Sequence, residues 1–311
     1  MGWFATATER RGRRSFRYAA EGRGVLAALL ISPAVLFIGL LVGVPLGLAV
    51  YLSFTDATAG SLTGKWVGLA NFRAALRDPI FRGALWHTFL FTVISQAIVI
   101  VVAGLLAHAL VRSFRGRWLL RFFVLLPWAA PVALTAIGFL WFFDPQASIF
   151  NWFLIHLHIV SSTNVPNWLG TPKAAMSSII AVQAWRTIPF ATVIFIAGIS
   201  SIPQEVDDAA AIDAATGLRK FWYVSLPLQL PIAIVAVLFG IVFTATDMVV
   251  PYILTNGGPF NSTQVLTTWA FQTGINAGDI GQGAAIALFM LPLLAVVVVG
   301  MLFFARRAEV T

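Results

Sequence analysis

Six long apolar segments limit what this 311-residue chain can fold into. They lie near Val25–Leu52, Leu85–Val111, Leu119–Phe143, Ala174–Ile199, Ile232–Leu254 and Ala284–Phe304. A run of about 20 apolar residues is long enough to cross the hydrocarbon core of a bilayer as a helix. The segments do not show the polar–apolar alternation of β-barrel strands. The sequence therefore predicts an all-α polytopic membrane protein with six transmembrane helices.

The composition agrees with this prediction and narrows the choice of partners. Hydrophobic residues make up 59% of the chain and charged residues 10%, whereas soluble proteins average about 25% charged residues. The net charge of +8 would suggest nucleic acid in a soluble protein. Here the basic residues cluster between apolar segments, as in loops that face anionic lipid, so we expect membrane lipid and no nucleic acid as a partner. The chain has no cysteine, which excludes disulfides and thiolate metal sites, and we expect no metal.

Positive charges predict the orientation of the chain. Fourteen of the 20 Lys and Arg residues fall in the N-terminal segment, the second-to-third loop, the fourth-to-fifth loop and the tail. Five fall in the loops on the other side. The positive-inside rule then places both termini in the cytoplasm. We predict a basic cytoplasmic segment over 1–24, a transmembrane domain over 25–304 with a long cytoplasmic loop over 200–231, and a cytoplasmic tail over 305–311.

The cytoplasmic loop Ser200–Pro231 is long for a connection between two helices. Ser201 and Gln204 fit a capping box, and Pro203 suits the first turn of a helix. Gly217 offers a residue at which that helix can end. The loop is therefore predicted to contain a short helix outside the membrane.

One face of this helix is small and mostly apolar. It consists of Val206, Ala209, Ala210 and Asp213, which share a side by helical spacing. Small side chains allow the backbone of a partner protein to approach closely. An amphipathic helix resting on lipid headgroups is the alternative. Because the four acids of the loop outnumber its two bases, an anionic lipid surface would repel it, and docking to a protein is favoured.

The same loop carries a resemblance to a known family. Residues 208–215, DAAAIDAA, followed by Phe221 and by Leu226 with Pro227, resemble the EAA loop of binding-protein-dependent ABC permeases. The family pattern runs E-A-A-x-x-D-G-A, then an aromatic residue, then L-P. Asp208 stands where the family has glutamate, and Ala214 stands where it has glycine. If that position needs a positive φ, Ala214 costs about 1 kcal/mol, unless Gly217 carries the turn instead.

Further segments resemble the carbohydrate-uptake branch of this family, typified by maltose and glycerol-3-phosphate permeases. They are Val67–Phe89, Pro127 with Phe143–Leu154, Trp185 with Pro189 and Phe190, and Leu254–Thr263. The resemblance implies a type I ABC importer permease in the bacterial inner membrane. It implies a second homologous permease, two ATP-binding subunits that hold ATP and Mg, and an extracytoplasmic solute-binding protein. It also implies that the EAA loop contacts the ATPase through Glu205, Asp208, Ala209, Ala210, Asp213, Ala214 and Gly217.

The sequence has no phosphate-binding G-x-x-x-x-G-K-[ST] motif, so the chain is not expected to hydrolyse ATP itself. We expect no catalytic residue and no cofactor in it. The predicted function is the permease subunit of an ATP-driven importer for a sugar or related polyhydroxylated solute. The alternatives are an ion-driven secondary transporter or a polytopic membrane enzyme.

Two charged residues, Arg186 and Asp247, fall inside predicted spans. Charges within a membrane are costly, and they usually face a polar interior or each other. We weigh equally that both line a hydrated pathway and that they form a structural pair. Further candidates for contact with the solute are Gln183, Trp185, Thr246 and Tyr252.

Overall fold

The computed structural model describes residues 23–61 and 63–308. The chain divides into two compact units, Met1–Tyr51 and Leu52–Thr311. Almost all of the predicted N-terminal segment, 1–24, lies outside the described residues. The predicted tail begins inside a helix, because the last helix, α16, runs over Met290–Ala308.

The first unit consists of apolar helices. Helix α2 (Arg23–Ile38) passes through a π-helical turn at Gly39–Gly43 into α3 (Val44–Ser53). A stretch of 28 residues, Leu26–Ser53, is long and apolar enough to cross a membrane. This confirms the first predicted span. Pro33 lies inside α2, where a membrane helix tolerates a proline better than a helix in water does.

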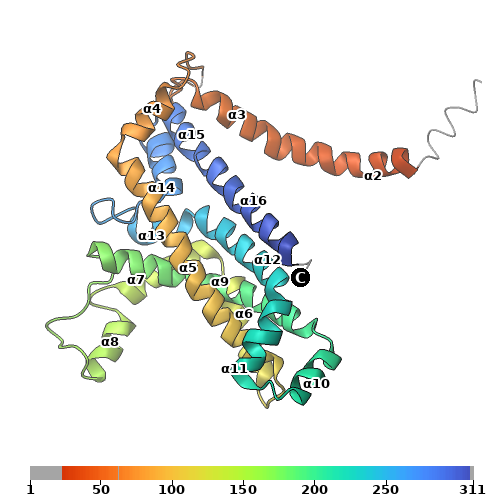
Figure 1. Ribbon diagram of the computed structural model, residues 1–311. Helices are drawn as coiled ribbons and strands as arrows, with labels where there is room; N and C mark the ends of the chain where they lie inside the picture. The colour runs from red at the N-terminus through yellow and green to blue at the C-terminus, as the bar shows by residue number, and fades with distance from the viewer. Residues whose placement is uncertain (1–22, 62, 309–311) are drawn as a thin grey trace, which may run out of the picture. The chain divides into compact units, whose positions relative to one another are not determined.

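The second unit contains helices of very different lengths (Figure 1). The long ones are α5 (Pro79–Val111), α9 (Pro172–Ser200), α12 (Leu226–Ala245) and α16. The shorter ones are α4 (Ala70–Arg77), α6 (Arg117–Ala129), α7 (Val132–Phe143), α8 (Ile149–His156), α10 (Gln204–Ile212), α11 (Gly217–Lys220), α13 (Val249–Thr255), α14 (Leu266–Phe271) and α15 (Ile280–Leu288). Two π-helical turns, Phe221–Ser225 and Gln272–Asn276, continue α11 into α12 and extend α14.

Helices α5, α9 and α12 form the centre of the second unit. The contact between α5 and α9 is the most extensive between any two helices described, and α12 packs on both. Small buried residues recur every fourth position on α5, at Val99, Ala103 and Ala107. They meet Ala184 on α9 and Ala236 on α12. Small side chains let membrane helices approach closely, which explains why these three helices form the core.

The third predicted span, Leu119–Phe143, is wrong as a single helix. It consists of α6 and α7, which are bent by 102° relative to each other at a short break. Ala130 adopts an extended conformation before Pro131, because the proline ring disfavours a helical residue ahead of it. With 13 and 12 residues, α6 and α7 are each too short to span a bilayer. Among residues 23–61 and 63–308, five helices are long enough, or six if the bent pair counts as one span.

The fifth predicted span, Ile232–Leu254, is wrong at both ends. The apolar helix covers Phe221–Ala245 and stops before Asp247. A new helix, α13, then begins at Val249. The backbone N–H of Val250 donates to Asp247 Oδ1 at 3.0 Å, so Asp247 stabilises the start of α13. The second, fourth and sixth predicted spans are confirmed by helical stretches over Pro79–Val111, Pro172–Ser200 and Ile280–Phe304.

Candidate functional site

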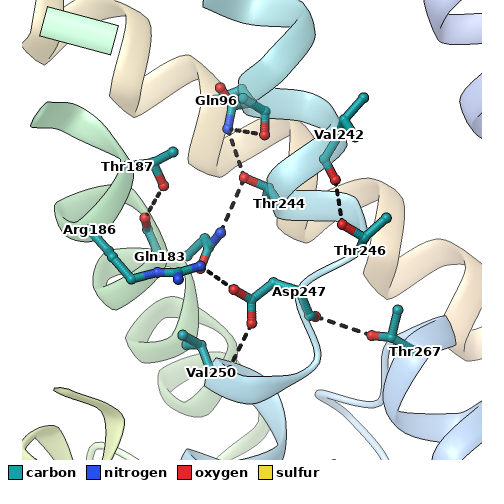
Figure 2. A network of polar contacts seen from close by, with 11 residues as sticks. Gln96, Gln183, Arg186, Thr187, Val242, Thr244, Thr246, Asp247, Val250 and Thr267 are labelled. Carbon is teal, nitrogen blue, oxygen red and sulfur yellow. Dashed lines mark hydrogen bonds and ion pairs between the residues drawn. The ribbon is translucent and has the colours of Figure 1, made fainter. Parts of the chain in front are cut away.

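The two intramembrane charges are brought together at the break between α12 and α13. Arg186, from the middle of α9, forms an ion pair with the carboxylate of Asp247 (Figure 2). The Arg186 side chain is 20% exposed and the Asp247 side chain 7%. The geometry therefore favours the second of the two interpretations weighed above, a structural pair.

A row of side-chain amides and a hydroxyl continues from this pair across three helices. Arg186 Nη2 donates to Gln183 Oε1 at 3.1 Å, and Gln183 Nε2 donates to Thr244 Oγ1 at 3.3 Å. From α5, Gln96 Nε2 donates to the same Thr244 oxygen at 2.8 Å and to the Gly240 carbonyl at 3.0 Å. Figure 2 shows this row running from Asp247 to Gln96. We call five residues the polar network: Gln96, Gln183, Arg186, Thr244 and Asp247.

The polar network satisfies Asp247 from several sides. Besides Arg186 and the Val250 N–H, the hydroxyl of Thr267 donates to the Asp247 carbonyl at 3.1 Å. A buried charge is tolerated when it is paired and its remaining acceptor atoms are hydrogen-bonded. The network therefore links α5, α9 and α12, and the Thr267 hydroxyl adds α14.

Gln183 lies inside the polar network, and its predicted contact with the solute stays a prediction. Its side chain is fully buried, and it links Arg186 to Thr244. Spacing alone could not show this, because Gln183 and Arg186 are three residues apart on the same helix whichever way that helix faces.

The other candidates for solute contact remain at least partly accessible. Trp185 is 37% exposed, and its ring lies edge-on to Phe139 at a centroid distance of 5.3 Å. Thr246 is exposed, and its hydroxyl donates to the Val242 carbonyl at 2.7 Å. Tyr252 is half-buried.

Sequence reasoning missed an aromatic group that spans three helices. Trp128 of α6 stacks on Phe190 of α9 at 4.9 Å, and Phe190 lies edge-on to Phe239 and Phe243 of α12. Trp128, Phe239 and Phe243 are each more than 40% exposed. The four residues come from three separate segments of the sequence, so no local pattern connects all of them.

Helix α10 lies in the loop where the sequence predicts a docking helix. The predicted capping box is wrong, because the Ser201 hydroxyl donates to the Gly198 carbonyl at 2.8 Å and so closes the end of α9. Pro203, in an extended conformation, stands directly before the helix. The N–H that proline lacks is one that a helix start would leave unpaired in any case.

The exposed face of α10 differs from the predicted one. Ala210 is buried in its own chain with 6% exposure, and Val206 is half-buried. Ala210 therefore packs against its own chain, and its predicted contact with the ATPase stays a prediction. The outward face consists of Glu205, Asp208, Ala209 and Ile212, at the helical spacing i, i+3, i+4 and i+7. Ile212, which the sequence analysis did not single out, is 86% exposed.

The end of α10 places alanine in a conformation that favours glycine. Asp213 is the C-cap residue of α10, and Ala214 follows it with a φ of +54°. The N–H of Ala215 donates to the Ala210 carbonyl at 2.9 Å, and that of Ala214 to the Ala211 carbonyl at 3.1 Å. This pair of bonds is a Schellman motif, which glycine usually closes. The family glycine position is therefore left-handed here, as the sequence analysis considered.

Gly217 does not end α10, contrary to the prediction. With a φ of +55°, it is the first residue of α11. The short helix α11 is tied back to α10 by an ion pair between Lys220 Nζ and Asp207 Oδ1 at 2.9 Å. Helices α10 and α11 thus form one closed hairpin.

Comparison with known proteins identifies the family of this chain. Residues 100–310 match the family model described as "Binding-protein-dependent transport system inner membrane component". The chain belongs to this family. It is thus a multi-pass inner-membrane permease, and family membership decides against the two alternatives, an ion-driven transporter and a membrane enzyme.

Relatives of the permease include proteins named for the sugar or glycoside that they transport. The permease is 31% identical over 278 residues to the sulfoquinovosyl glycerol transport system permease protein SmoG of Agrobacterium fabrum, covering 89% of each chain. It is 33% identical over 223 residues to the trehalose/maltose transport system permease protein MalF of Thermococcus litoralis, covering 72% of this chain and 74% of the relative.

The fold of the permease also matches a solved importer. A chain of a bacterial alginate ABC transporter, solved in complex with an alginate pentasaccharide-bound periplasmic protein, aligns with a TM-score of 0.77. The alignment covers 93% of the permease and 96% of that chain at 18% identity. This likeness confirms the predicted fold, an all-α permease of the ABC importer type.

Proposed function

We propose that this permease forms part of the translocation pathway for a sugar or related polyhydroxylated solute in an ATP-driven importer. Two relatives are named for a glycoside or for disaccharides, and a structural neighbour belongs to a transporter that imports the polysaccharide alginate. The exposed aromatic group of Trp128, Phe190, Phe239 and Phe243 supports this, because aromatic faces stack on the apolar faces of sugar rings. Trp185, Thr246 and Tyr252 remain proposed pathway residues, whereas Arg186, Asp247 and Gln183 are proposed to fix the helices that carry them.

The outward face of α10 is the observation that carries the proposed coupling to an ATP-binding subunit. Ile212 is 86% exposed and stands beside small Ala209 and acidic Glu205 and Asp208. Burying an isoleucine side chain contributes about 1.5–3 kcal/mol, so a groove that accepts this face would be stabilised by it. Because α10 is closed by the Schellman motif and by the Asp207–Lys220 pair, it can move as a rigid body.

The position of α10 near the arginine-rich loop after α5 supports a cytoplasmic location for this helix. The ring of His108, near the end of α5, lies 5.3 Å from that of Phe221, which directly follows α11. The arginine-rich loop after α5 is therefore at the same end of the unit as α10. We propose that this end and both termini face the cytoplasm, following the positive-inside rule.

The proposed assembly contains a second homologous permease, two ATP-binding subunits and an extracytoplasmic solute-binding protein. The family description names a binding protein, and the structural neighbour was solved with a periplasmic one. In this assembly ATP and Mg belong to the ATP-binding subunits. That the permease chain holds no cofactor stays a prediction.

A matched pair of substitutions on α10 tests the coupling. Ala209 and Ala211 are both exposed, but they point about 200° apart around the helix, since each residue turns it by about 100°. In the assembled transporter, Ala209→Arg is expected to abolish solute-stimulated ATP hydrolysis and sugar uptake. Ala211→Arg should leave both near the wild-type value. Equal loss in the two variants would contradict docking through the outward face.

Cross-linking gives a second reading of the same question. The chain has no cysteine, so Ala209→Cys or Ile212→Cys introduces a single thiol into the permease. A thiol–amine cross-linker should then join the permease to the ATP-binding subunit from the cytoplasmic side. If an impermeant reagent added outside the cell labels either thiol, both the docking and the orientation are refuted.

A further inference from the structure

A small cavity lies between α5, α6 and α9, near the arginine-rich end of the unit. Its volume is about 220 Å³. One side is formed by Arg121, and the walls include Leu110, Val124, Leu125, Val193 and Ile196. The cavity therefore combines one cationic group with a mostly apolar surface.

Arg121 is not satisfied by the rest of the described chain. Its Nη2 donates to the Leu110 carbonyl at 3.4 Å, which is long for a hydrogen bond. Its Nε is buried and has no hydrogen-bond partner. Neither of the two ion pairs among residues 23–61 and 63–308 involves Arg121. A guanidinium has five donors, so Arg121 keeps unused capacity for an oxygen-bearing anion.

A second guanidinium lies on the same side of α6. Arg117 is four residues before Arg121 and thus one turn away. Its Nη1 donates to the Val111 carbonyl at 3.3 Å. The sequence from Arg112 to Arg121 contains four arginines and neither Asp nor Glu. No carboxylate of this segment competes for the cations.

The flanks of the cavity point to a lipid as the source of the anion. Trp118 and Phe122 of α6 are 74% and 58% exposed, and tryptophan side chains collect at membrane interfaces. A free phosphate ion would use the guanidinium but would gain nothing from the apolar walls. We propose that this cavity binds the headgroup phosphate of an anionic phospholipid, with Arg121 and Arg117 on the phosphate and an acyl chain along Val193 and Ile196.

The test compares two arginines in lipid nanodiscs. The full-length permease is incorporated into mixed phosphatidylglycerol and phosphatidylcholine, and retained lipid is measured by native mass spectrometry after release. Arg121→Gln is expected to lower phosphatidylglycerol retention about fivefold, whereas Arg115→Gln, in the loop before α6 and exposed, should change it less than about twofold. Equal loss in both variants would overturn the proposal, because it would show a diffuse charge effect.

A cavity-filling variant keeps the test decisive if Arg121→Gln does not fold. Val193 is 49% exposed, so Val193→Phe can occupy the apolar wall while every arginine stays in place. Retention of phosphatidylglycerol should again fall about fivefold. Unchanged retention in Val193→Phe would overturn the site. Inorganic phosphate that displaced the lipid at low millimolar concentration would overturn the lipid as its occupant.

Discussion

Acidic side chains are used in opposite ways in the polar network and on α10. The Asp247 side chain is 7% exposed, pairs with Arg186 and accepts the N–H that starts α13. Glu205 and Asp208 are exposed on a face that also presents Ile212. The comparison teaches that a buried acid serves the fold of its own chain, whereas exposed acids beside an exposed isoleucine remain available to a partner.

Breaking the buried pair should give the largest effect. Arg186→Ala or Asp247→Ala leaves one charge buried without its partner, which is expected to cost about 3–5 kcal/mol of unfolding free energy. The double variant should be far less destabilised than the sum of the two, because no unpaired charge then remains. Denaturant unfolding of the permease in detergent measures all three. Asp208→Ala on α10 is the control and should change stability little; additive losses for Arg186 and Asp247 would contradict the pairing.

A smaller effect is expected where the polar network meets a glycine. A Cβ at Gly240 would overlap the side-chain amide of Gln96, which donates to the Gly240 carbonyl. Gly240→Ala should therefore cost about 1–3 kcal/mol through overpacking. Gly138→Ala in α7 is matched to it, because a Cβ there meets nothing within 4 Å. Thermal unfolding should separate the two variants; similar melting temperatures would show that Gln96 moves aside without cost.

On the α10 side of the comparison, a substitution should stabilise the chain. Ala214 has a φ of +54°, so Ala214→Gly is expected to gain about 1 kcal/mol. The opposite change, Gly217→Ala at a φ of +55°, should lose a similar amount. Hydrogen exchange of the α10 amides reports both effects locally. Faster exchange in Ala214→Gly would show that the left-handed turn is not what limits this helix.

The smallest effect concerns a third acid, which is neither buried in a pair nor part of the outward face. The backbone N–H groups of Ala147 and Gln146 donate to the Asp144 carboxylate and hold its pKa below the usual value. The stabilisation of this turn is therefore present above the ordinary pKa of an aspartate and is lost as the pH falls through the lowered pKa. Protection of the two amides, measured relative to their intrinsic exchange rates, should fall over that range in the wild type. Asp144→Asn should remove this pH dependence, and an unchanged profile would argue against the carboxylate as its source.

The sequence by itself determined the spans α5, α9 and α16, the position of a helix in the long loop, and the family. These features depend on local properties, namely apolar length, turn residues and a short motif. The bend between α6 and α7 also has a local cause in Pro131, and attention to that residue could have predicted it.

Only the tertiary structure decided which way each side chain faces. Arg186 and Asp247 are 61 residues apart, and only the packing of α9 against α12 and α13 makes them a pair. The same packing buries Gln183. The burial of Ala210 turns Ile212 outward, because helical spacing fixes which residues share a face but not which face meets the rest of the chain. Hydropathy can be read from a segment alone, whereas the burial of a side chain depends on which other segments pack against it.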